Sequence, residues 1–170
     1  MTVLNRNPKS VNFLQPSKFL LSFDRVSTVS YQCQQVNIPG VTLGVVTRDT
    51  PFVDLYSPGT KLSYNPLVVT FFIDEELESW KSLQTWFNSI ANPDGFEKRD
   101  HGRELQTNKH LSDATLTILS NLNNPLVRIR FADCFPMDMG DITFDTQQSA
   151  DNIITVTATF RYNFYTIENA

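Results

Sequence analysis

The side chains best suited to chemistry in this chain are a group of aspartates in its last third. They are Asp133, Asp138, Asp141, Asp145 and Asp151. A calcium loop of the EF-hand type needs oxygen ligands at its first, third and fifth positions, with glycine at the sixth. Counted from Asp138, the third position is Gly140 and the fifth is Ile142, so the frame fails. We therefore interpret these aspartates as turn-forming and solvated residues.

Two histidines, His101 and His110, are the other candidates for a metal site or a catalytic base. The segment HGRE at 101–104 lacks the HExxH order, and no cysteine lies nearby to complete a zinc set. A Ser-His-Asp triad assembles in space and leaves no linear pattern, but no GxSxG turn supports one. GVTLG at 40–44 lacks the third glycine of a dinucleotide loop. We predict no catalytic residue, no metal and no cofactor, and interpret the histidines as exposed loop residues.

The charge of the chain argues against a surface that binds nucleic acid. Its 170 residues include 14 basic and 18 acidic side chains, a net charge of -4 at pH 7. Phosphate binding relies on clustered Lys and Arg, and the densest basic segment, Lys98–Arg103, is interrupted by Asp100. That segment could still face a specific partner. The hydrophobic fraction of 41%, with 13 Phe, is ample for a packed core.

Cysteine usage and the N-terminal segment bear on the compartment. Cys33 and Cys134 form no CxxC pair, and we expect buried reduced thiols, which suit synthesis in the cytosol. The segment MTVLNRNPKSVNFLQPSK has no continuous apolar core of the kind a signal peptide needs. No apolar run approaches the roughly 20 residues of a membrane helix. These features predict a soluble protein with no membrane partner.

The rest of the sequence predicts a mainly β domain with one helix. Residues 1–17 are expected to form an N-terminal arm, and residues 18–167 one domain. Turns are predicted at Pro39-Gly40 and Pro58-Gly59. Alternation predicts strands at 18–24, 30–38, 41–47, 52–56, 67–73, 114–120, 126–131 and 152–167. The helix 74–91 is followed by a long polar loop, 96–112.

A strand is predicted to run directly into this helix between Leu67 and Ala91. Leu67, Val69 and Phe71 share one face of the strand. After Asp74 the apolar period changes to about 3.6 residues, and Asp74 is expected to be the N-cap. The predicted apolar stripe of the helix is Leu77, Trp80, Leu83, Phe87 and Ile90, and Trp86 widens it. This junction indicates architecture and not a carboxylate-based active site.

The closing strand alternates over an unusual length. One face carries Ile154, Val156, Ala158, Phe160, Tyr162 and Phe164. The other face carries Thr155, Thr157, Thr159, Arg161 and Asn163. Such alternation indicates one face on a core and the other on water or a polar interface. Because a strand of about 13 residues exceeds the usual length, we expect it to bend around a barrel or project beyond it.

Taken in order, these elements resemble the tail tube proteins of contractile, T-even-like phages. The matching segments are QCQQVNIPGVTLG at 32–44, PFVDLYSPGTKLSYNPLVVTFFIDEELESWKSLQTWF at 51–87 and SDATLTILS at 112–120, followed by the closing strand. The resemblance extends to baseplate tube initiators and to the related tube protein of type VI secretion. It implies a small antiparallel β-barrel or sandwich with a flanking α-helix. Six copies would form a ring, and stacked rings would form the channel through which DNA is ejected.

The resemblance also implies candidate contact surfaces. Thr155, Thr157, Thr159 and Arg161 would face the lumen or a subunit interface, with strands 114–120 and 126–131 as alternatives for the lumen. His101, Arg103, Glu78 and Lys81 are candidates for inter-ring or sheath contacts, as are the segments 1–17, 39–51 and 96–112. The implied partners are further copies of the chain and the sheath, baseplate and tape-measure proteins. DNA would pass without specific binding.

We therefore expect a structural protein of the virion tail, made in the host cytoplasm and not an enzyme. Its ring would belong to the tube or to the baseplate-proximal initiator. Two hypotheses from other classes stay open at this point. One is a monomeric β-barrel that binds a ligand in an apolar cavity, and the other is a hydrolase that uses His101 or His110.

Overall fold

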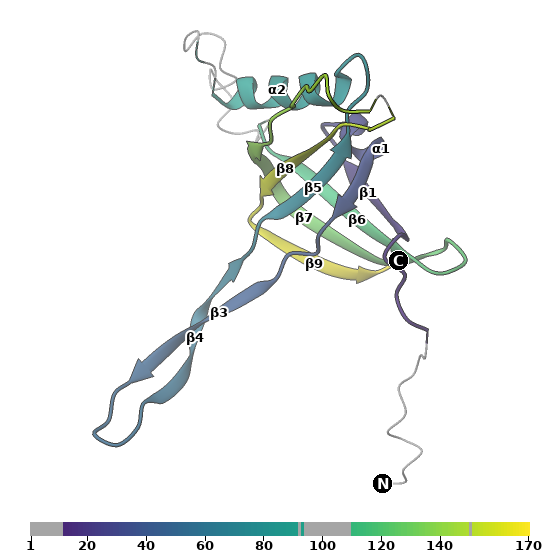
Figure 1. Cartoon of the computed structure of the whole chain (residues 1–170). Helices are drawn as coiled ribbons and strands as arrows, with labels where there is room; N and C mark the ends of the chain where they lie inside the picture. The colour runs from purple at the N-terminus through teal and green to yellow at the C-terminus, as the bar shows by residue number, and fades with distance from the viewer. Residues whose placement is uncertain (1–11, 92, 94–109, 150) are drawn as a thin grey trace.

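Two helices and nine strands form the described part of the chain, residues 12–91, 93, 110–149 and 151–170, in a computed structural model (Figure 1). In chain order the elements are β1 (Phe19–Phe23), α1 (Ser27–Tyr31), β2 (Cys33–Val36), β3 (Val41–Arg48), β4 (Leu55–Tyr64), β5 (Leu67–Phe72), α2 (Glu78–Ile90), β6 (Ser112–Leu119), β7 (Pro125–Met139), β8 (Thr155–Arg161) and β9 (Phe164–Asn169). All the pairings between these strands are antiparallel.

Strand β7 belongs to two groups of strands that lie on either side of the core. Sheet A contains β1, β6, the first part of β7 and β9, in that spatial order. Sheet B contains β2, β5, β8 and the last part of β7. Strands β3 and β4 form a separate two-stranded sheet that projects from this body (Figure 1).

The passage of β7 from one sheet to the other occurs at Asp133. This residue has φ 56°, in the left-handed region that non-glycine residues rarely adopt. Its N–H donates to Oδ1 of Asp113 in β6 at 3.2 Å, and its Oδ2 accepts from Nδ2 of Asn163 at 2.8 Å. Asp133 therefore turns the strand and fastens the β8–β9 corner to it, which agrees with its interpretation as a turn-forming acid.

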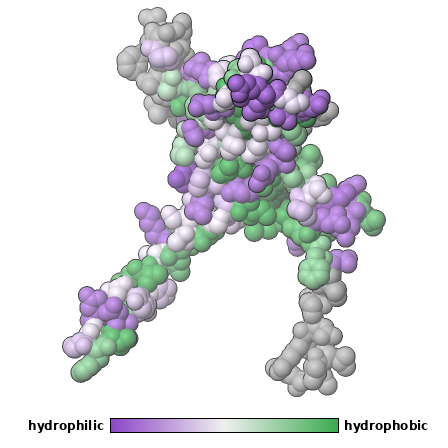
Figure 2. All heavy atoms as spheres, in the orientation of Figure 1, coloured by the Kyte–Doolittle hydropathy of each residue, from purple (hydrophilic) through white to green (hydrophobic). Residues whose placement is uncertain are grey.

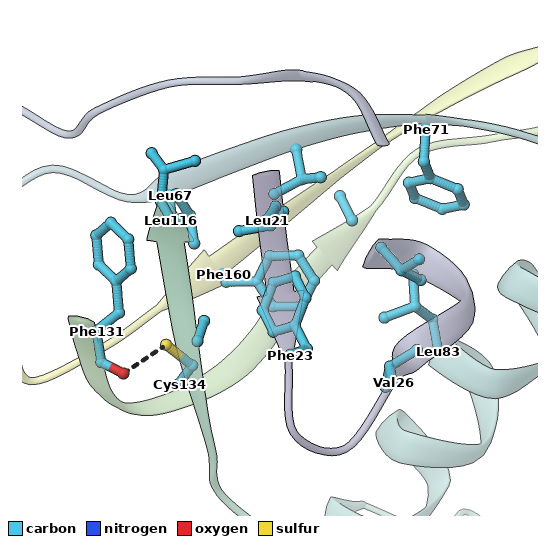
Figure 3. Packing of buried hydrophobic residues seen from close by; sticks show 14 of the residues in the cluster. Leu21, Phe23, Val26, Leu67, Phe71, Leu83, Leu116, Phe131, Cys134 and Phe160 are labelled. Carbon is cyan, nitrogen blue, oxygen red and sulfur yellow. Dashed lines mark hydrogen bonds between the residues drawn. The ribbon is translucent and has the colours of Figure 1, made fainter. Parts of the chain in front are cut away.

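The core lies between the two sheets and is closed at one end by the helices (Figure 3). The ring of Phe160 in β8 packs against that of Phe23 in β1 in a tilted arrangement, with 4.8 Å between centroids, and its centroid lies 6.0 Å from that of Trp86 in α2. The strand alternation predicted for β5 is confirmed, because Leu67, Val69 and Phe71 are fully buried. The core therefore joins side chains from both sheets and from α2.

Helix α1 replaces the first part of the strand predicted at 30–38. Its sequence, STVSY, has weak helix propensity, so the helix depends on tertiary contacts. Val29 is fully buried, Oγ of Ser30 accepts the N–H of Phe23, and Thr28 Oγ1 lies 3.1 Å from Ser82 Oγ in α2. The predicted strand is correct only over β2.

The turn predicted at Pro58-Gly59 is also wrong, because both residues lie inside the long strand β4. Pro58 pairs with Val45, and the register shifts between Leu43 and Val45. A Cβ on Gly59 would lie 2.6 Å from the carbonyl oxygen of Gly44, so the two strands approach closely here. Glycine at such a position marks a bulge and not a reversal of the chain.

Helix α2 begins at Glu78, four residues after the predicted start at 74. Leu77 occupies the N-cap position with φ 56°, and Asp74 acts from a preceding turn, its Oδ1 accepting the N–H of Glu78 at 3.0 Å. The buried positions of the helix are Ser79, Leu83 and Trp86. The face of the helix that is buried therefore differs from the predicted apolar stripe. Its buried aromatic residue is Trp86, not Trp80.

The closing strand predicted at 152–167 is divided into β8 and β9. Its alternation holds within β8, where Val156, Ala158 and Phe160 are buried. The chain then turns at Tyr162 and Asn163, so the strand bends instead of projecting. Because of this turn Phe164, which was predicted to lie on the core face, is 49% exposed.

Candidate functional site

The largest exposed apolar feature is the hairpin of β3 and β4, which we call the arm (residues 41–64). Every residue of β3 is exposed, so neither face of the arm rests on the body. The adjacent Val45 and Val46 point to opposite faces, and Phe52 at the tip is 97% exposed. Figure 2 shows hydrophobic side chains along the arm, interleaved with polar ones. An isolated hairpin is only marginally stable in water, so this geometry is typical of a segment that packs on a partner.

The base of the arm is fastened to the body by tyrosines. Tyr64, Phe131, Tyr162 and Tyr165 form an aromatic cluster, with Phe131 and Tyr162 ring centroids 5.0 Å apart. The Tyr162 hydroxyl donates to the carbonyl oxygen of Asn65 at 2.8 Å, and the Tyr165 hydroxyl donates to that of Pro39. Burial, followed by the neighbouring Tyr165, raises the pKa of Tyr162 to about 12, so this hydroxyl stays protonated and able to donate.

Asn37 holds the same base from the other side. Its Oδ1 accepts the N–H of Val68 at 2.7 Å, and its Nδ2 donates to the carbonyl oxygen of Pro66. The N–H of Asn65 donates to the carbonyl oxygen of Gly40. The arm is therefore directed by fixed hydrogen bonds at the point where it leaves the body.

The four residues predicted to face a lumen or an interface lie together on the outer face of β8. Thr155, Thr157 and Arg161 are exposed, and Thr159 is half-buried. Oγ1 of Thr157 lies 3.1 Å from Oγ1 of Thr70 on β5. Arg161 donates from Nη1 to the carbonyl oxygen of Tyr64, at the base of the arm. What this face contacts stays a prediction.

The outer face of sheet A is the more strongly charged of the two. Arg128 and Arg130 alternate with buried residues on β7 and are exposed. Nε of Arg130 lies 3.9 Å from a carboxylate oxygen of Glu168 on β9. At this exposed position the pair contributes little to stability. The pair lies on the polar outer face of sheet A, which includes the two strands predicted at 114–120 and 126–131 as alternatives for the lumen.

The other predicted contact residues are only partly within the described structure. Glu78 and Lys81 lie on the first turn of α2 and are exposed. His101 and Arg103 lie outside the described residues, as do most of the predicted loop 96–112 and residues 1–11 of the predicted N-terminal arm. For all four contact residues, the inter-ring or sheath role stays a prediction.

Asp145 and His110, two of the residues weighed as candidates in the sequence, have structural contacts. Oδ1 of Asp145 accepts the N–H of Gln147 at 2.9 Å in a turn, and the carbonyl oxygen of His110 accepts the Trp86 indole N–H at 2.8 Å. Burial raises the pKa of the Cys33 thiol to about 11 and that of Cys134 to about 12, so neither is a thiolate at neutral pH. Within the described residues no cluster of His, Cys, Asp and Glu is suited to hold a metal ion.

Comparisons with known proteins identify the class of protein. A family model of phage tail tube proteins matches residues 6–168. The chain belongs to this family. It is 27% identical over 164 residues to the tail tube terminator protein of Enterobacteria phage T4, covering 92% of this chain and 90% of that protein. The chain is thus a structural protein associated with a contractile tail tube, and the prediction that it is not an enzyme is confirmed.

Solved structures confirm the fold predicted from the resemblance. The tube-terminating cap of the anti-feeding prophage superposes with a TM-score of 0.69 at 13% identity, covering all of both chains. The protein Hcp1 from Flavobacterium johnsoniae superposes with a TM-score of 0.52 at 13% identity, over 90% of this chain and 96% of that one. The mainly β, antiparallel prediction is correct. Within the described residues two helices accompany the strands instead of one, and the strand order there is open, with no closed barrel.

The sequence interpretation missed the arm as a unit. The turn predicted at Pro58-Gly59 falls inside the ten-residue strand β4, which the sequence therefore does not predict as one strand. The available signal was Gly59, because a glycine inside a strand often marks a bulge or a close approach of another backbone. Among the described residues, neither helix has the length and apolar character needed to cross a membrane.

Proposed function

We propose that this chain forms a six-membered ring that ends the tail tube of a contractile phage. The 27% identity to the T4 tail tube terminator, along nearly the whole of both chains, supports a position at the end of the tube. A ring within the tube, or the baseplate-proximal initiator, are the alternative positions predicted from the sequence. In each position the ring surrounds a channel through which DNA leaves the particle.

The observation that carries this proposal is the arm. Its apolar side chains are exposed on both faces, while its base is fixed to the body by Asn37, Tyr162 and Tyr165. A soluble monomer rarely presents such a surface, so a protein partner should cover it. An arm directed away from the body suits a contact with the last ring of the tube, which would join one ring to the next.

The charge of the subunit supports passage of DNA without binding. The net charge of -4 repels phosphate, and the described residues contain no dense lysine and arginine patch. Sheath, baseplate and tape-measure proteins are the partners that such a ring would meet in the virion tail. The chain would be made in the host cytoplasm and incorporated during tail assembly.

Mass measurement and electron microscopy test the ring. The purified chain, alone and mixed with the tail tubes of its phage, should give particles of six times the 19.4 kDa chain mass, with six-fold symmetry and a channel. Such rings should lie at the ends of the tubes. A chain that stays monomeric in both conditions would refute the proposal and would favour the monomeric ligand-binding barrel.

The arm is tested by the double substitution Phe52→Ser and Val53→Ser at its tip. Both side chains are exposed in the subunit, so folding should be unchanged, while binding to tube ends should be lost. The matched control is Leu122→Ser, which removes a residue that is 82% exposed in the β6–β7 turn. If the tip variant binds tube ends as well as the control does, the arm is not the contact.

A further inference from the structure

We propose that the arm binds its partner through one face only, which we call the Val45 face, and that it meets an uncharged apolar strip on the last ring of the tube. The opposite Val46 face stays turned to water. The inference rests on the proposed function, since it needs the arm as the contact. It adds which side of the arm makes the contact and what chemistry that side meets.

The pairing of β3 with β4 assigns the residues of the arm to two faces. Residues directly opposite each other in an antiparallel pair share a face, and so do alternate residues of one strand. Val45 is paired with Pro58 and Val46 with Ser57, so these two pairs lie on opposite faces. The Val45 face also carries the pairs Val41–Tyr64, Leu43–Leu62 and Thr47–Tyr56. The Val46 face also carries the pairs Thr42–Ser63 and Arg48–Leu55.

The two faces differ in character. None of the paired residues on the Val45 face is charged, and Thr47 is the only one that is neither aliphatic nor aromatic. Val45 is 64% exposed and Tyr56 is 71% exposed, although both are hydrophobic. Every pair on the Val46 face contains a polar or charged side chain. The Val45 face is therefore an apolar stripe, whereas the Val46 face is mixed.

The bulge in the arm does not interrupt this stripe. At the bulge Gly44 of β3 lies opposite three residues of β4, 59–61. Between the flanking pairs β4 therefore has two residues more than β3, an even number, so Leu62 and Pro58 stay on the same face. A single extra residue would have moved every side chain of β4 beyond the bulge to the other face.

The stripe begins at the core of the body and runs outward. The ring centroid of Tyr64, at the base of the arm, lies 5.4 Å from that of Tyr165 and 6.0 Å from that of Tyr162. From there the stripe follows the eight residues of β3, about 26 Å at the usual rise of a strand. The arm projects away from the body along this length (Figure 1). The partner should therefore offer an apolar strip of similar length.

The charges of the arm indicate what kind of surface fits the stripe. Arg48 lies on the Val46 face, Lys61 lies in the bulge, and Asp49 and Asp54 lie beyond the paired residues at the tip. DNA would need cations on the contact face, and the paired residues of the Val45 face supply none. A charged protein surface would lose its hydration against the stripe without gaining a counter-charge. An uncharged apolar protein strip is therefore the complement, and the proposed function places it on the last ring of the tube.

The test compares Val45→Asp with Val46→Asp in the full chain. The two residues are adjacent and similarly exposed, at 64% and 59%, so each substitution adds the same charge and the same poor strand former to one face. Binding to tail tubes assembled without this chain is measured by cosedimentation over a concentration series. Val45→Asp should weaken binding by at least about tenfold, and Val46→Asp should stay within about threefold of the wild type.

A second matched pair tests whether the stripe continues across the bulge. Leu43→Asp should weaken binding as Val45→Asp does, whereas Thr42→Asp, on the Val46 face, should leave it unchanged. All four side chains are exposed in the subunit, so each variant should keep its fold. Thermal unfolding of each variant alone checks this and separates folding from binding.

Loss of binding confined to the two variants of the Val45 face supports the inference. Similar binding by Val45→Asp and Val46→Asp, or loss confined to the Val46 face, would overturn it; the proposed function still stands if the tip variant at Phe52 and Val53 fails to bind. If Val45→Asp abolishes ring formation by the chain alone, the stripe faces a second copy, and the assignment of the partner is overturned. A wild-type chain that binds no tube ends would overturn the proposed function and this inference together.

Discussion

Replacing Phe160 by alanine removes the ring that joins sheet B to sheet A and to α2. Phe160 is fully buried, and its ring centroid lies 4.8 Å from that of Phe23 and 6.0 Å from that of Trp86. Truncation of a buried phenylalanine costs about 3–5 kcal/mol, the lost transfer free energy plus the cavity that remains. Because these two neighbours come from different elements, β1 and α2, the site should collapse only partly, and we expect about 4 kcal/mol, a large share of the total stability of a domain of this size.

The assay is unfolding in urea followed by circular dichroism, with Thr157→Ala on the same strand as the control. Thr157 is exposed, and its hydroxyl contacts only that of Thr70 among the described hydrogen bonds, so its loss should cost less than about 0.5 kcal/mol. The slope of the transition should be similar for both variants, because each leaves the fold intact. Equal losses at the two positions would refute the assignment of the two faces of β8.

Three further changes test local features. Asp74→Ala leaves the first N–H of α2 without its acceptor and should lower the free energy of unfolding by about 1 kcal/mol; an unchanged urea midpoint would contradict the capping role. Gly59→Ala places a Cβ 2.6 Å from the Gly44 carbonyl oxygen, so NMR signals of the arm should shift while those of the core stay; shifts spread over both would argue against an independent arm. Burial raises the pKa of Cys33 to about 11 and of Cys134 to about 12, from 9.0. The folded state holds these protons more tightly, so their contribution is complete below pH 9.0 and falls as the pH rises towards 11. The variant with both substitutions, Cys33→Ser and Cys134→Ser, should therefore lose less stability than the wild type between pH 9.0 and 11. Parallel profiles of the free energy of unfolding against pH would contradict the raised thiol pKa values.

The strands that bury one face could be predicted from sequence because their alternation survives in the fold. Leu67, Val69 and Phe71 on β5 and Val156, Ala158 and Phe160 on β8 were assigned to the core correctly. In these strands burial follows directly from position in the sequence, because every second side chain points towards the opposite sheet. The class of protein followed from the order of the same elements.

The features that sequence could not supply depend on contacts between distant residues. Helix α1 exists because Val29 is buried and Ser30 bonds to Phe23, which no propensity reveals. The division of the closing strand depends on Asn163 bonding to Asp133, 30 positions earlier in the chain. The burial of Trp86 in α2 accompanies a hydrogen bond from its indole N–H to the carbonyl oxygen of His110, 24 positions later in the chain.

Strand β7 gives the subunit a mechanical property. Because its 15 residues pair with β6 and β9 at one end and with β8 at the other, one continuous backbone runs through both sheets. A force along the tail that reaches sheet A is carried to sheet B through the covalent backbone of β7. The hydrogen bonds that pair β7 with β6, β8 and β9 are then loaded in shear. The two sheets cannot slide past each other without breaking those ladders together. The subunit should thus respond to the recoil of a contracting tail as a single stiff body.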